Sequence, residues 1–103
     1  MEKKIYLIRG NDGRYKIGIS KNPSKRIKEL QTGNSDKMTI IDTYESIYAP
    51  QIESALHRYY SHSRKEGEWF DLSVVEESNF IKNCQKIDQS LQALKKLGNI
   101  YVI

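Results

Sequence analysis

The stretch "IYLIRGNDGRYKIGIS", residues 5–20, decides how the first half of the chain folds. Two runs rich in β-branched and aromatic residues flank "NDG" at residues 11–13, a combination typical of a β-hairpin. In a three-residue hairpin loop, a type I turn is followed by one residue in the left-handed conformation, and this position suits Gly13. We therefore expect two antiparallel strands in which Gly10 lies opposite Arg14.

This register also predicts which side chains share a face of the sheet. Counting outward from the loop, Ile8 lies opposite Lys16 and Tyr6 lies opposite Gly18. Directly opposed residues of antiparallel strands point to the same face, so Tyr6 and Lys16 become diagonal neighbours. Gly18 then leaves room beside the Tyr6 ring. A two-residue loop would instead place Tyr6 and Lys16 on opposite faces.

The segment after the hairpin predicts a short helix. Asn22 suits its N-cap, Pro23 suits its first position, and Gly33 suits the residue that ends it. Ile27 and Leu30 are spaced to face inward.

Residues 38–45 are expected to form a third strand, and Pro50 is expected to open a second helix. On that helix Ile52, Leu56 and Tyr59 recur at helical spacing, which predicts that they face the core.

Two polar residues of the second helix, Glu53 and His57, lie one turn apart and so share a face. Residues 64–72, "RKEGEWFDL", are expected to form a loop or a short extended segment. Within it, Trp69 and Phe70 are predicted to cover the core beneath the second helix.

A last helix is predicted to begin at Ser73, where Glu76 completes a capping box, and to stop at Gly98. Residues 99–103, "NIYVI", would form a short strand or a tail. The helix carries a long apolar stripe that is expected to pack on the domain or on a second copy of the chain. The stripe consists of Phe80, Cys84, Ile87, Leu91 and Leu94.

The totals indicate a single domain, because the chain has 103 residues. Its formal net charge of +4 suggests a polyanionic partner. Cys84 is the single cysteine, which excludes an internal disulfide and a zinc site built from cysteines. We see no apolar run that reads as a signal peptide or membrane span, so we expect a cytoplasmic protein without a membrane partner.

Taken in order, five segments resemble the GIY-YIG nuclease superfamily, in its small branch from phages and large DNA viruses with a "KIG" motif. The segments are "IYLIR", "YKIGIS", "KRIKEL", "IESALHRYY" and "GEWFDL". The resemblance implies an α+β fold in which helices flank a small antiparallel sheet of about three strands. We accordingly divide the chain into a nuclease-like domain, residues 1–72, and a C-terminal helix with a short tail, residues 73–103, packed on the same domain.

The resemblance also implies a site for metal-dependent phosphodiester hydrolysis on one face of the sheet. Tyr6 matches the tyrosine of the first motif, Gly18 the glycine of the second, Arg26 the helix arginine and Glu53 the metal-binding glutamate. Lys16 takes the place of the second motif's tyrosine. Three further departures concern the first motif's glycine, which is replaced by Lys4, and the family's late asparagine, which has no match although Glu68 and Asp71 lie nearby.

The chemistry suggests a role for each of these residue types. Glu53 would hold Mg²⁺ or Mn²⁺. Arg26 would grip phosphate oxygens, and Tyr6 would take a proton from water. Lys16 would either lower the pKa of Tyr6 or bind phosphate itself, and His57 is a further catalytic candidate. Four more cations are expected to contact DNA: Lys21, Lys25, Lys28 and Arg58.

Two other functions also fit this sequence. Each residue of the site has an ordinary structural role available to it, so the chain could be a catalytically impaired, GIY-YIG-like nucleic-acid-binding domain. The last helix could instead serve protein interaction, including a homodimer.

Overall fold

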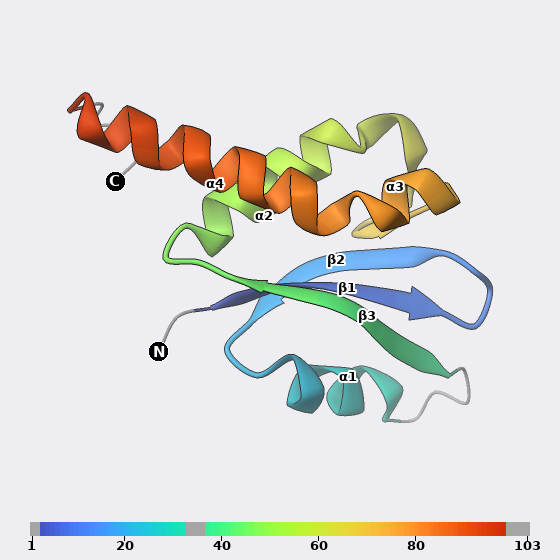
Figure 1. The fold of residues 1–103 in the computed structure, drawn as a ribbon. Helices are drawn as coiled ribbons and strands as arrows, with labels where there is room; N and C mark the ends of the chain where they lie inside the picture. The colour runs from blue at the N-terminus through green and yellow to red at the C-terminus, as the bar shows by residue number, and fades with distance from the viewer. Residues whose placement is uncertain (1–2, 33–36, 99–103) are drawn as a thin grey trace.

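The computed structural model of the chain describes residues 3–32 and 37–98. Its centre is a five-stranded sheet in the order β3-β1-β2-β5-β4, with antiparallel pairing throughout. Helix α1 lies on one side of the sheet, and α2 and α4 lie on the other (Figure 1). The sheet flanked by helices and the C-terminal helix confirm the expected fold class. The strands are β1 (Lys4–Gly10), β2 (Tyr15–Ser20), β3 (Met38–Glu45), β4 (Arg64–Glu66) and β5 (Trp69–Phe70).

The hairpin between β1 and β2 has the register predicted from its loop. Tyr6 lies opposite Gly18 and Ile8 lies opposite Lys16. The loop closes where the Gly10 N–H donates to the carbonyl oxygen of Arg14 at 2.8 Å. Its last residue, at position 13, is a glycine with φ 86°, the left-handed conformation that the turn requires. Tyr6 and Lys16 therefore share one face of the sheet.

The sheet has two strands more than the expected number. The segment predicted as a loop or extended run forms a small hairpin, β4 and β5, whose turn is made possible by Gly67 at φ 55°. In β5, Phe70 pairs with Tyr15 and Trp69 pairs with Lys16, so the hairpin extends the edge of β2. These strands are too short to show the alternation that reveals a strand in a sequence.

Helix α1 (Pro23–Gln31) begins as predicted, because the Asn22 side chain accepts a hydrogen bond from the Lys25 N–H. Its inward residues, Ile27 and Leu30, are partly buried. The helix ends at Thr32, and the predicted stop at Gly33 lies outside the described residues.

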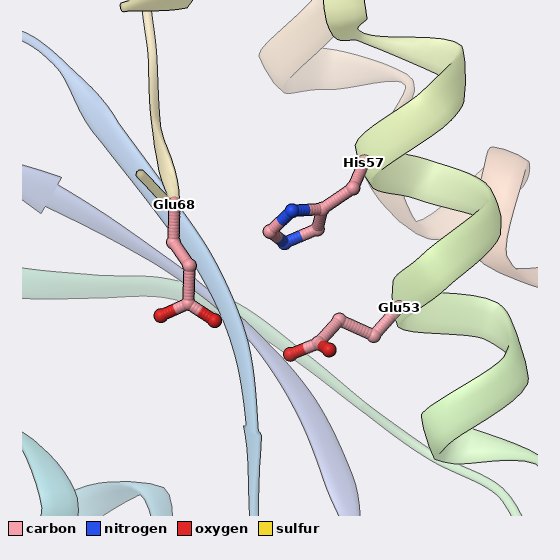
Figure 2. A group of neighbouring side chains, drawn as sticks. All are labelled: Glu53, His57 and Glu68. Carbon is pink, nitrogen blue, oxygen red and sulfur yellow. The ribbon is translucent and has the colours of Figure 1, made fainter. Parts of the chain in front are cut away.

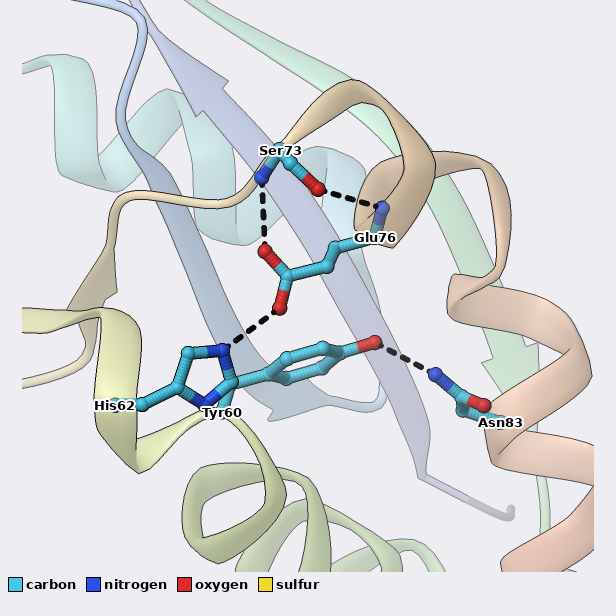
Figure 3. Close-up of polar contacts among 5 residues, drawn as sticks. All are labelled: Tyr60, His62, Ser73, Glu76 and Asn83. Atoms are coloured by element: carbon cyan, nitrogen blue, oxygen red, sulfur yellow. Dashed lines mark hydrogen bonds and ion pairs between the residues drawn. The ribbon is translucent and has the colours of Figure 1, made fainter.

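Helix α2 (Ala49–Tyr59) buries Ile52 and Leu56 as expected, but Tyr59 is 60% exposed. The aromatic ring in the core belongs to Tyr60 instead. The helix ends just before this residue, and the change in backbone direction turns its ring inward. Its hydroxyl accepts a hydrogen bond from Asn83 Nδ2 at 2.9 Å (Figure 3).

The C-terminal part begins with the predicted capping box between Ser73 and Glu76 (Figure 3). It forms two helices, α3 (Val74–Ser78) and α4 (Phe80–Lys96), rather than one, after the short 3-10 helix η1 (Ser61–Ser63) that follows α2. Gly98, at φ 77°, follows the end of α4. Residues 99–103 lie outside the described part of the chain.

The apolar stripe of α4 packs largely on its own domain. Phe80 and Cys84 are fully buried, and Ile87 and Leu91 pack against the same core. Leu94 is 39% exposed, so the stripe emerges from the core at its end. A homodimer through this end of the helix stays a prediction. Within the described residues, every helix is too short or too polar to cross a membrane.

Candidate functional site

The site forms at the edge of β2, where the pairing with β5 stops. Strand β5 pairs with Tyr15 and Lys16, and the next residue of β2 bonds to other parts of the chain. The N–H of Ile17 donates to the carbonyl oxygen of Glu68 at 3.4 Å, and the carbonyl oxygen of Ile17 lies 2.9 Å from Nε2 of His57. One backbone position of β2 thus brings the β4–β5 turn and helix α2 together.

Three side chains converge beside this edge: Glu53, His57 and Glu68 (Figure 2). Glu53 and His57 come from successive turns of α2, and Glu68 comes from the turn between β4 and β5. One possible ligand atom from each lies within 4.8 Å of the others, and all three side chains are half-buried. Two carboxylates and an imidazole at this separation are a donor set that suits a divalent metal ion.

The electrostatics of Glu53 are those of a carboxylate that lacks a full counter-charge. Burial raises its pKa, and the neighbouring charge of Glu68 raises it further. His57, Lys16 and Lys3 oppose these effects. Because a nearby cation favours the ionised carboxylate, a metal ion at this position would reverse the direction of the shift.

Lys16 has a different partner from the one expected. Its Nζ donates to Oε2 of Glu68 at 2.7 Å and lies 5.7 Å from the centroid of the Trp69 ring. The residue is only 8% exposed. The prediction that Lys16 lowers the pKa of Tyr6 is therefore wrong for this arrangement, since the charge of Lys16 is directed at Glu68.

Arg26 is the cation that acts on Tyr6. Its side chain hydrogen-bonds to the Tyr6 hydroxyl, and a guanidinium only donates, so the hydroxyl oxygen accepts. The pKa of Tyr6 is nevertheless raised, chiefly by burial and further by the charges of Glu68 and Glu53, while Arg26 lowers it. Arg26 also approaches Glu29, at 3.5 Å.

Gly18 makes the position of the Tyr6 ring possible. A Cβ atom at Gly18 would lie 2.6 Å from Tyr6 Cζ and 3.1 Å from Cε1, closer than carbon atoms approach. The space predicted beside this ring is thus present and filled by the ring itself.

The four predicted DNA contacts fall into two groups. Lys21 and Lys25 line the same shallow depression as Arg26, at the start of α1. Lys28 is exposed and lies about 200° around the helix from Arg26. Arg58 is exposed on the side of α2 that faces away from the core. The structure therefore brings the first two, but not the last two, next to the site.

Glu68 is the residue of this cluster that sequence reasoning did not include among the site residues. It was noticed only as a neighbour of a missing asparagine. Nothing local in "GEWF" shows that Glu68 reaches α2, because its position depends on the pairing of β5 with β2. The place of Glu68 in the "GEWF" segment, which the family resemblance singles out, was the available signal.

Comparison with known proteins gives one family. The model of the T5orf172 domain matches residues 3–86. No curated protein and no solved structure matches the chain. The match spans β1 through the first part of α4 and so includes all three residues of the cluster. On this evidence, the chain belongs to the T5orf172 domain family.

Proposed function

We propose that this protein is a divalent-metal-dependent endonuclease of GIY-YIG type that hydrolyses phosphodiester bonds of DNA. The observation that carries the proposal is the meeting of two groups at one edge of β2. These are the pair of Tyr6 with Arg26 and the cluster around Glu53, whose charge acts on Tyr6. Membership of the T5orf172 domain family is compatible with a nuclease or DNA-binding role.

The residues present fit a bound Mg²⁺ or Mn²⁺ ion. Glu53 offers a half-buried carboxylate whose raised pKa reflects missing positive charge. Mg²⁺ retains several of its waters and is often held by one or two carboxylates together with substrate phosphates. When bound, such an ion would supply positive charge to the oxygens of the scissile phosphate.

The protein groups have separable roles in this proposal. Arg26 presents N–H donors that suit phosphate oxygens, and its bond to Tyr6 favours the phenolate over the phenol. Tyr6 accepts the proton of the attacking water. Lys16, whose Nζ is held by Glu68, is a less available phosphate ligand than an unpaired lysine.

DNA would approach along the start of α1. Lys21 and Lys25 lie beside Arg26 there and would neutralise backbone phosphates. Lys28 and Arg58 would contribute only if the duplex wraps past the site. The proposed location is the cytoplasm, where the free thiol of Cys84 would remain reduced.

A second function is favoured by two observations. The pKa of Tyr6 is raised rather than lowered, and Lys16, in place of a second tyrosine, is tied to Glu68. Both suit a DNA-binding domain that has lost cleavage.

The experiment is a plasmid-nicking assay with Mg²⁺ or Mn²⁺ on wild type, Glu53→Gln and the control Glu66→Gln, an exposed carboxylate of β4. The amide keeps the shape of Glu53 but is a poor metal ligand. We expect nicking by wild type and the control, no nicking by Glu53→Gln, and no nicking in EDTA. Cleavage by Glu53→Gln at the wild-type rate would refute the metal assignment. DNA binding without cleavage by wild type would establish the second function.

A further inference from the structure

We propose that His57 and Glu68 complete, with Glu53, a mixed nitrogen–oxygen site that binds Mn²⁺ in preference to Mg²⁺. This inference rests on the proposed function and specifies the metal of that site. It adds two ligands to the single carboxylate that the family resemblance implies. Its basis is that each added residue is already held in the way that protein metal ligands are held.

The hydrogen bond of His57 fixes which ring nitrogen is free. Nε2 lies 2.9 Å from the carbonyl oxygen of Ile17. A carbonyl oxygen only accepts, so Nε2 carries the proton and Nδ1 of the neutral ring keeps its lone pair. Histidines that bind metals commonly donate their second ring N–H to a backbone carbonyl in this manner. The Phe70 ring, edge-on at 5.0 Å and 89°, also restrains the imidazole.

Glu68 is held in a comparable way. Its Oε2 accepts from Lys16 Nζ at 2.7 Å, and its carbonyl oxygen accepts from the Ile17 N–H at 3.4 Å. An ionised carboxylate has two oxygens, so the ion pair leaves Oε1 available for a metal. Lys16 thus positions a ligand and limits the repulsion between Glu68 and Glu53.

The separation of the donors matches a single ion after a small closure. The three ligand atoms lie within 4.8 Å of one another. Ions with metal–ligand bonds of about 2.0–2.2 Å hold their ligand atoms roughly 3–4 Å apart. The choice of metal follows from the donors, because Mg²⁺ strongly prefers oxygen whereas first-row transition ions also accept imidazole nitrogen. Mn²⁺ is the ion of that series that also suits carboxylates and water.

Calorimetry on the intact chain tests the preference. Mn²⁺ and Mg²⁺ are titrated into wild type, His57→Phe and the control His62→Phe, the same change at the chain's other histidine, which is exposed and paired with Glu76. We expect wild type to bind Mn²⁺ at least about tenfold more tightly than Mg²⁺. His57→Phe should lose at least about tenfold in Mn²⁺ affinity and little in Mg²⁺ affinity, as removal of a ligand requires. Glu68→Gln should lose about tenfold for both ions, and Glu66→Gln neither.

A second measurement needs no variant. In ¹⁵N-histidine-labelled wild type, diamagnetic Zn²⁺ should shift the Nδ1 resonance of His57 to a metal-bound position and leave that of His62 unchanged. Equal affinities for Mn²⁺ and Mg²⁺, or an unshifted His57 Nδ1 when the metal site is saturated, would overturn the inference. Metal bound through Glu53 alone would leave the proposed nuclease function standing. Tight Mn²⁺ binding through His57 without any cleavage of DNA would instead refute the function and support the site.

Discussion

Replacing Gly18 with alanine tests how the position of Tyr6 is set. The new methyl carbon would lie 2.6 Å from Tyr6 Cζ and 3.1 Å from Cε1, whereas carbon atoms pack at about 3.5–4.0 Å. The ring would have to move by roughly 1 Å. It is only 2% exposed and packed between the sheet and α1, so this movement would disturb the core and the bond to Arg26.

The expected cost is that of inserting a methyl group into a well-packed interior, about 1–3 kcal/mol of unfolding free energy. Without the clash, alanine in a strand would stabilise the protein by roughly 0.5–1 kcal/mol relative to glycine, so the sign of the effect is informative. For a domain of this size, each kcal/mol lost lowers Tm by about 4–8 °C.

The assay is urea or thermal unfolding of Gly18→Ala in two backgrounds, wild type and Tyr6→Leu. Leucine lacks the outer ring carbons that the methyl group would meet. In the Tyr6→Leu background we therefore expect the Gly18→Ala change to be neutral or stabilising. An equal cost in both backgrounds would refute the reasoning, because the two residues would then not be coupled.

Four further predictions concern other parts of the molecule. Lys16→Met should raise the pKa of Glu53, since Lys16 lowers it; a carboxyl ¹³C titration that shows no rise would contradict the assignment of this charge. Ser73→Ala should cost about 1 kcal/mol in urea unfolding through loss of the capping box, and an unchanged midpoint would show that the box is not stabilising. The bonds from the Ser73 N–H and from His62 lower the pKa of Glu76, so its stabilising contribution is present above the unfolded carboxylate pKa of about 4.3 and is lost as pH falls through the lower folded value. Wild type should therefore lose stability in that acid range, and Glu76→Gln should lose less. Burial raises the pKa of Cys84 to about 12, so its thiol should resist thiol reagents at about pH 8 until the protein unfolds; reaction at the rate of a free thiol would contradict its burial.

The sequence by itself determined the features that rest on contacts between near neighbours. The three-residue loop ending in Gly13 set the β1–β2 register, and with it the shared face of Tyr6 and Lys16. Asn22 and Ser73 marked the starts of two helices, because an N-cap bonds to a backbone N–H only a few residues away. Such interactions need no knowledge of the rest of the chain.

The tertiary structure alone decided which charges meet. Lys16 pairs with Glu68, and Tyr6 pairs with Arg26, through contacts between segments distant in the sequence. The sequence could not place Glu68 beside His57, because that neighbourhood depends on a two-residue strand pairing with the edge of β2. Residue spacing determines which side chains share a face, but the partner of a buried charge is chosen by whichever opposite charge the packed chain brings within reach.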